Sequence, residues 1–254
     1  MTFTRTWTEG PEAKARVVLV HGLAEHVGRY DHVGTWLAAR GYPTYASDLP
    51  GFGTSPGPKG HVDSFDDFLD AVEASVVEVG TDLPVVLYGH SLGGLIAATY
   101  AVSGRPRPDR LVLSTPALAY AGPGWQKPIA MALSRIAPTF SMPNGLKGEQ
   151  LSSDPTVGEA YFADPLVLTK SSIRLAAESF AAMDAIGAKL VELEIPTYVL
   201  HGSDDSVVPP QGSVAIGALP GVTRRLWVGL RHECHNEPNW EEVLDDLLQW
   251  LDAA

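Results

Sequence analysis

Cysteine is almost absent from this sequence of 254 residues, in which Cys234 stands alone. A lone cysteine cannot form an internal disulfide, so nothing ties the fold to an oxidising compartment. Basic residues are also scarce: 18 Lys and Arg stand against 30 Asp and Glu, which gives a formal net charge of -12. A chain of this charge repels nucleic-acid phosphates and anionic lipid surfaces, so we expect no nucleic-acid partner.

Long apolar runs are missing as well. No stretch approaches the roughly 18 uninterrupted apolar residues of a membrane-spanning helix, and the first ten residues contain no run of signal-peptide length. We therefore expect a soluble, cytoplasmic protein. Hydrophobic residues make up 45% of the chain and charged residues 19%, as in an ordinary globular protein with a sizeable core.

Short apolar runs rich in β-branched residues alternate with segments of helical periodicity. The expected strands cover residues 17–20, 43–47, 85–88, 111–114, 197–200 and 225–228, and the expected helices cover 30–40, 64–79, 92–103, 211–218 and 239–251. A strand followed by a helix, repeated along the chain, predicts an α/β fold with a doubly wound, mostly parallel sheet.

One stretch breaks this alternation. Between residues 116 and 194 no clear strand appears, and prolines separate short helical pieces. We expect residues 1–115 and 195–254 to form the core domain, and residues 116–194 to form an inserted, mainly helical cap. Four apolar residues at helical spacing give the cap one apolar face: Trp125, Ile129, Leu133 and Ile136. The face either packs onto the main domain or serves as an apolar lid for a substrate.

A serine lies where an expected strand turns into an expected helix. Gly89-His90-Ser91-Leu92-Gly93 follows the strand over 85–88 directly, which is the context of a nucleophile elbow. The small residues beside Ser91 let such a turn close, and the helix N-terminus behind it favours developing negative charge. Ser91 is therefore the candidate nucleophile.

A serine needs a histidine to take its proton and a carboxylate to hold that histidine in its productive tautomer. In a sheet of this kind the acid and then the histidine follow the serine along the chain. The loop after strand 197–200 carries Asp204 and Asp205, and the loop after strand 225–228 carries His232 and His235. The residue pattern by itself does not choose within either pair.

The developing oxyanion needs two backbone N–H donors. The residue after the nucleophile, Leu92, is the first candidate. The second is Leu23, in the His21-Gly22-Leu23-Ala24 loop that follows strand 17–20.

Several segments together resemble one family, the monoacylglycerol lipase and lysophospholipase-like serine hydrolases of the α/β-hydrolase fold. Residues 21–30 resemble the family's HGxxEHxxRY signature, and residues 48–55 resemble its DxxGxGxS turn. Residues 89–94 are similar to its GHSxGG elbow. Residues 201–208 and 231–237 resemble the segments that carry its catalytic acid and histidine.

The resemblance implies which member of each pair acts. It aligns Asp205 with the family's acid and His232 with its histidine. It also implies that neither a metal nor an organic cofactor is needed, and that the cap forms an apolar tunnel for an acyl chain and often touches membranes. In that interpretation the apolar face of the cap binds substrate through Trp125, Ile129, Leu133 and Ile136. Membrane contact is expected to be peripheral and weak at most.

We therefore expect a serine ester hydrolase that cleaves monoacylglycerols through an acyl-enzyme intermediate, with a small lipid ester as its partner. Two alternatives stay open: a general carboxylesterase, lysophospholipase or acyltransferase on the same triad, and a non-catalytic ligand-binding homologue. A zinc site at His232, Cys234 and His235 is not expected, because no further ligands follow at suitable spacing. Glu25, His26 and Arg29 are expected to brace the oxyanion loop.

Overall fold

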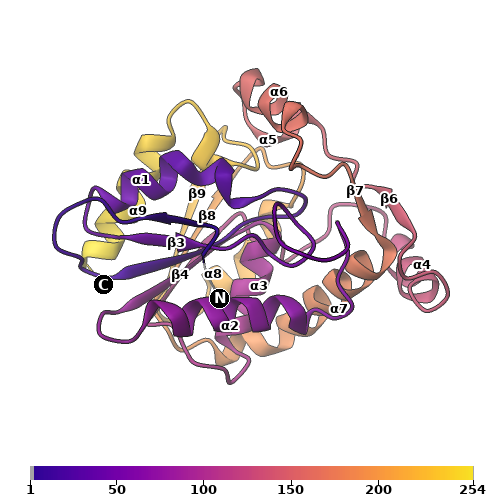
Figure 1. Ribbon diagram of the computed structural model, residues 1–254, viewed down its shortest axis with the longest axis horizontal. Coiled ribbons are helices and arrows are strands. Elements are labelled where there is room, and N and C mark those ends of the chain that lie inside the picture. Colours follow the sequence, from indigo (N-terminus) through magenta and orange to yellow (C-terminus); the bar gives the residue numbers. More distant parts are fainter. Residues whose placement is uncertain (1–2, 254) are drawn as a thin grey trace.

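A twisted central sheet forms the frame of the protein (Figure 1). The structure is a computed structural model that describes residues 3–253; residues 1, 2 and 254, which the predicted core domain includes, lie outside the described part. Among the described residues, the seven strands of the central sheet follow the order β1-β3-β2-β4-β5-β8-β9. Among the strand pairs described in this sheet, β1–β3 alone is antiparallel. The strands are β1 (Arg5–Trp7), β2 (Arg16–Val20), β3 (Thr44–Ala46), β4 (Val85–His90), β5 (Arg110–Ser114), β8 (Thr197–Gly202) and β9 (Val222–Trp227).

Helices cover both faces of this sheet. One face carries α1 and α9, and the other carries α2, α3, α7 and α8 (Figure 1). The α-helices of the sheet layers are α1 (Asp31–Ala38), α2 (Asp66–Val79), α3 (Leu92–Ala101), α7 (Ile173–Lys189), α8 (Val214–Gly217) and α9 (Trp240–Ala253). Short 3-10 turns are η1 (Val27–Tyr30), η2 (Leu190–Glu192), η3 (Pro210–Ser213) and η4 (Cys234–Asn236). The prediction of a doubly wound, mostly parallel α/β sheet is confirmed.

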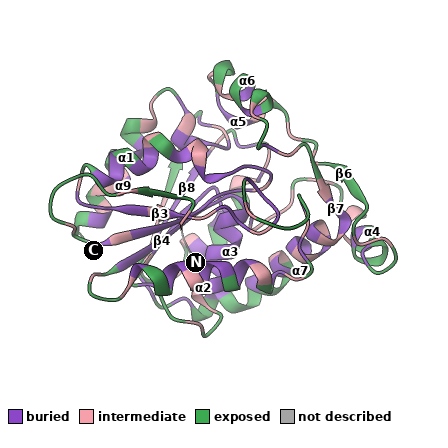
Figure 2. Cartoon of the chain, in the orientation of Figure 1, coloured by how far each residue is buried: buried purple, intermediate pink, exposed green. Residues whose placement is uncertain are grey.

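The apolar runs of the sequence become the central strands. Every residue of β4 and β8 is buried, because helices shield both faces of a doubly wound sheet (Figure 2). Strand β1 was not predicted from the sequence; it has three residues, two of which are exposed. Its place at the edge of the sheet, antiparallel to β3, demands little apolar character and so leaves little pattern to find.

The segment between β5 and β8 interrupts the sheet pattern, at the place where the cap is expected. It contains α4 (Gln126–Leu133), α5 (Gly148–Leu151), α6 (Pro155–Ala163) and a small antiparallel pair of strands, β6 (Ser141–Pro143) and β7 (Lys170–Ser172). The sequence analysis found no strand here. We call residues 116–194 the insertion, and its boundaries stay a prediction. Its last helix, α7, shares the main hydrophobic core with α2 and α3.

Candidate active site

Ser91 occupies a strained turn between β4 and α3. Its backbone has φ 52° and ψ -116°, a region that residues with a side chain adopt rarely and at a cost of roughly 1–3 kcal/mol. The turn is tight because the start of α3 lies against β2: a Cβ atom on Gly93 would lie 2.2 Å from the carbonyl oxygen of Val20. The side chain of Ser91 is thereby held at the carboxyl end of the sheet, beside the N-terminus of a helix.

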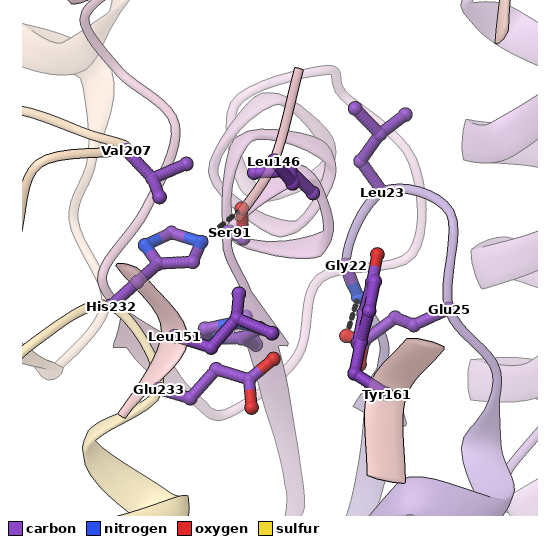
Figure 3. A pocket seen from close by; sticks show the side chains of 11 residues that line it. Gly22, Leu23, Glu25, Ser91, Leu146, Leu151, Tyr161, Val207, His232 and Glu233 are labelled. Carbon is purple, nitrogen blue, oxygen red and sulfur yellow. Dashed lines mark hydrogen bonds between the residues drawn. The ribbon is translucent and has the colours of Figure 1, made fainter. Parts of the chain in front are cut away.

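The structure brings the three predicted side chains together from three separate loops. His232 Nε2 lies 2.9 Å from Ser91 Oγ, and His232 Nδ1 lies 2.8 Å from Asp205 Oδ2 (Figure 3 draws the first contact). All three residues are buried. A proton of the serine hydroxyl can pass to Nε2 while the carboxylate holds the proton on Nδ1.

The surroundings of Asp205 keep it ionised. Burial raises the pKa of its carboxyl, but the charge of His232 and hydrogen bonds from His201, His232 and the backbone lower that pKa well below its usual range. The N–H groups of Val207 and Val208 both donate to its Oδ1, at 2.8 and 2.9 Å. The neighbouring Asp204 is exposed and accepts a hydrogen bond from Ser203 instead. The carboxylate that the structure gives to His232 is therefore Asp205.

His232 is poised to act as a base. Burial lowers the pKa of its imidazole, but the charge of Asp205 and the hydrogen bond to it outweigh burial, so the pKa lies above its ordinary value. His90 packs against it at 4.9 Å between ring centroids. Burial, and then the charge of His232, lower the pKa of His90 to about 3, which keeps it neutral. His235 stacks on Tyr30 at 5.0 Å between ring centroids, and neither of its ring nitrogens has a hydrogen-bond partner among the described residues.

The oxyanion loop lies against the serine. A Cβ atom on Gly22 would be 3.3 Å from Ser91 Cβ, so only a glycine allows the loop this close without displacing a neighbour. Gly22 N donates to Glu25 Oε1 at 2.6 Å, which folds the loop back on itself (Figure 3). Leu23 lines the pocket beside Ser91, and Leu92 begins α3 directly after it. Their roles as oxyanion donors stay predictions.

A buried ionic cluster supports this loop. Arg29 forms ion pairs with Glu25 and with Glu233, the latter through two hydrogen bonds of 2.7 Å. Tyr30 also donates to Glu25, at 2.6 Å. His26 contacts Asp164 of the insertion at 2.8 Å between its Nε2 and Oδ2. Glu25, His26 and Arg29 thus lie where bracing contacts were expected.

A small cavity of about 50 Å³ opens in front of Ser91 (Figure 3). Its walls combine the residues of the site with side chains from the insertion, namely Leu146, Leu151 and Tyr161. These three residues were not predicted as site residues, because they lie in a stretch without apolar periodicity.

The four predicted cap residues lie elsewhere. Trp125, Ile129, Leu133 and Ile136 do not line this cavity; they lie at and around α4 and are 61%, 48%, 40% and 83% exposed. Their role as substrate-binding residues stays a prediction.

No group of His, Cys, Asp and Glu within residues 3–253 is arranged to hold a metal ion. Cys234 is buried within the loop that carries His232. Burial, and to a smaller extent the charge of Asp205, raises the pKa of its thiol far above its usual value. Such a thiol is inert rather than nucleophilic. None of the helices described here is both long and apolar enough to cross a membrane.

Comparison with known proteins identifies the family. The family described as "Serine aminopeptidase, S33" (Hydrolase_4) matches residues 11–239. The chain belongs to this family of α/β-hydrolases. The predicted membership in the monoacylglycerol lipase-like serine hydrolases is confirmed by relatives that align along most of the chain.

Two curated relatives of this α/β-hydrolase are more than 30% identical to it. The monoacylglycerol lipase of Mycolicibacterium smegmatis is 34% identical over 96% of this chain and 90% of its own length. Phospholipase YtpA of Bacillus subtilis is 33% identical over 94% of this chain and 95% of its own. A longer Dictyostelium discoideum abhydrolase domain-containing protein is 29% identical, and the chain spans 27% of its length.

A solved structure agrees with these relatives. The crystal structure of the Paleococcus ferrophilus monoacylglycerol lipase superposes with a TM-score of 0.90 at 33% identity, over 99% of this chain and 98% of that one. The predictions of an α/β-hydrolase fold and of membership in the monoacylglycerol lipase-like family are therefore confirmed.

Proposed function

We propose that this α/β-hydrolase is a serine ester hydrolase that cleaves monoacylglycerols into free fatty acid and glycerol. The observation that carries the proposal is the hydrogen-bonded series Ser91–His232–Asp205 at the cavity, in a chain 34% identical to a monoacylglycerol lipase. The relatives support the substrate class, and the geometry supports the chemistry.

In acylation, Ser91 Oγ attacks the ester carbonyl while His232 Nε2 takes its proton. Asp205 stays ionised and stabilises the imidazolium that forms. The negative charge on the carbonyl oxygen falls where the Leu23 and Leu92 N–H groups are expected to donate. As the tetrahedral intermediate collapses, His232 protonates the glycerol oxygen and glycerol leaves. The acyl group remains bound to Ser91.

Deacylation repeats these roles with water as the nucleophile. His232 takes a proton from water as the water attacks the acyl carbonyl, and then returns the proton to Ser91 Oγ. Fatty acid leaves and the enzyme is restored. No metal or organic cofactor has a part in these steps.

The apolar cavity supports a substrate with an acyl chain, since each methylene removed from water contributes about 0.8 kcal/mol. A cavity of about 50 Å³ holds only a few water-sized groups. Binding of a long chain therefore requires side chains of the cavity wall, such as those of Leu146 and Tyr161, to move.

We also propose weak, peripheral contact between the insertion and a lipid surface. Trp125, Ile129 and Ile136 are exposed together with Phe140 and Met142, which are 59% and 48% exposed. Exposed apolar groups gathered in one short stretch favour a lipid partner. A cytoplasmic location remains a prediction of the sequence.

A phospholipase activity is the second candidate, because YtpA is a phospholipase and is 33% identical to this chain. The net charge of -12 favours an uncharged glycerol head group over an anionic phospholipid. The two candidates use the same triad and differ only in the group that leaves.

The experiment is hydrolysis of monoacylglycerols of increasing chain length, measured beside diacylglycerol, triacylglycerol, lysophospholipid and short carboxylic esters. We expect monoacylglycerols to be the best substrates and Ser91→Ala to abolish turnover. Faster turnover of the lysophospholipid would establish the second candidate. Equal turnover of short esters would leave a general carboxylesterase. A wild-type protein that neither hydrolyses any ester nor reacts with a fluorophosphonate at Ser91 would be a non-catalytic binding protein.

A further inference from the structure

The loop that carries His232 leaves the edge of the sheet. β9 is the last strand of the sheet in the described chain, so a neighbouring strand, β8, lies on one side of this loop only and the other side is left open. The insertion takes that place. His232 N donates to Gln150 O at 3.3 Å, and Glu233 N donates to Leu151 O at 2.8 Å. The backbone of the histidine is thus hydrogen-bonded to a segment about 80 positions earlier in the chain.

Glu237 fastens the same two segments together. Its carboxylate is 1% exposed, and all four of its hydrogen-bond donors are neutral groups. Oε1 accepts from Arg231 N at 2.7 Å, next to His232. Oε2 accepts from Ser153 N at 2.8 Å, from Ser152 Oγ at 3.1 Å and from Ser153 Oγ. We call residues 228–237, which include His232, the histidine loop. The carboxylate of Glu237 joins this loop to the insertion through its two oxygens.

The guanidinium of Arg231 adds a second link. Its Nη1 donates to Glu149 O at 2.7 Å and to Ser152 O at 2.8 Å. The hydroxyl of Ser152, which has one proton, shares it between Asn236 O at 2.9 Å and the carboxylate of Glu237. Residues 149–153 of the insertion, which we call the anchor segment, are thus bound from both ends of the histidine loop. Leu151, in the middle of the anchor segment, lines the cavity beside Ser91.

We propose that Glu237 is a positioning residue for catalysis, which holds His232 in line with Ser91 by binding the histidine loop to the anchor segment. This inference rests on the proposed function, because it takes His232 as the base. Its consequence is that part of the insertion belongs to the catalytic machinery and not only to the wall of the cavity. A displacement of a catalytic group by about 1 Å can cost roughly 100-fold in rate.

Glu237→Gln tests this role with almost no change of shape. One carboxylate oxygen becomes an NH2 group, which then faces the N–H of either Arg231 or Ser153. Two donors cannot bond, whichever way the amide is turned. We expect kcat to fall by about tenfold or more, with KM changed less than about twofold, because the lost alignment acts on the reaction and not on binding.

Glu241→Gln is the matched control, since Glu241 is exposed on α9. The readouts are kcat, KM and the rate at which a fluorophosphonate labels Ser91, all measured below the melting temperature of each variant. We expect the labelling rate to fall in parallel with kcat. If Glu237→Gln only melts at lower temperature, and its kcat and labelling rate equal those of the control, the proposal is overturned.

A double-mutant cycle with Ser153→Ala tests whether Glu237 acts through the insertion. Ser153→Ala alone should lower kcat, as Glu237→Gln does. It serves as the test if Glu237→Gln does not fold. In the Glu237→Gln background it should cost less than in the wild type, because both changes weaken the same link between the two segments. Fully additive losses would overturn the route through the anchor segment. A wild-type enzyme that a fluorophosphonate does not label would instead overturn the proposed function itself.

Discussion

At the scale of the residue, the protonation of His232 governs activity. Only the neutral imidazole can take the proton of Ser91. Since Asp205 holds the pKa of His232 above its ordinary value, the base is lost as the pH falls through that raised pKa. We expect kcat/KM to rise with pH, with a midpoint above about 6.5, the ordinary histidine value.

Asp205→Asn should change both the rate and the midpoint. The rate should fall by roughly 10⁴-fold, because the amide no longer holds the productive tautomer. The midpoint should move to lower pH, because the charge that raises the pKa of His232 is gone. Asp204→Asn is the neighbouring control, and its exposed carboxyl should leave the pH profile of kcat/KM as in wild type. An unchanged midpoint in Asp205→Asn would contradict this electrostatic account.

At the scale of the element, the close contact of α3 with β2 holds Ser91 in its strained turn. A methyl group on Gly93 would meet the backbone of β2 at 2.2 Å, and backbone cannot rotate away as a side chain can. Gly93→Ala should therefore destabilise the protein by about 1–3 kcal/mol and lower kcat, because α3 and the serine must move. Gly187→Ala on α7 has open space and should stabilise by up to about 1 kcal/mol. Urea denaturation measures the stability of both variants. Equal denaturation midpoints for Gly93→Ala and Gly187→Ala would refute the close contact of α3 with β2 as the cause.

Some of these elements could be predicted from the sequence, and some of the site residues could not. Buried strands such as β4 and β8 leave a local apolar signature, so the sheet and the loops that follow its strands could be predicted. The apolar face of α4 was also visible, but periodicity cannot tell what covers a face, and here much of it is exposed. Leu151 was missed as a site residue, and the contacts of Glu237 with the insertion were not predicted, because both depend on contacts between distant segments, which no local pattern records.

At the scale of the whole molecule, two properties act in opposite directions at a lipid surface. The net charge of -12 repels anionic lipids, and the exposed side chains of the insertion favour an apolar phase. We expect weak sedimentation with neutral phosphatidylcholine vesicles, and weaker sedimentation as anionic lipid is added.

Ile136→Asp should reduce that sedimentation, because Ile136 is 83% exposed in the apolar stretch. Val77→Asp is the control: Val77 is 60% exposed, but it lies on α2, outside the insertion. Binding that rises with anionic lipid, or that both variants lose equally, would rule out contact through the insertion.

The hydrogen bonds between the anchor segment and the histidine loop also limit how this protein can be engineered. Exchanging the insertion for that of a relative is an obvious way to change which acyl chains are accepted. A graft that replaces Gln150–Ser153 by residues that Arg231 and Glu237 cannot bind would displace the backbone carbonyls that accept from His232 N and Glu233 N. Such a chimera would acquire a new binding cavity and lose the alignment of its base, so specificity and rate cannot be redesigned independently in this fold.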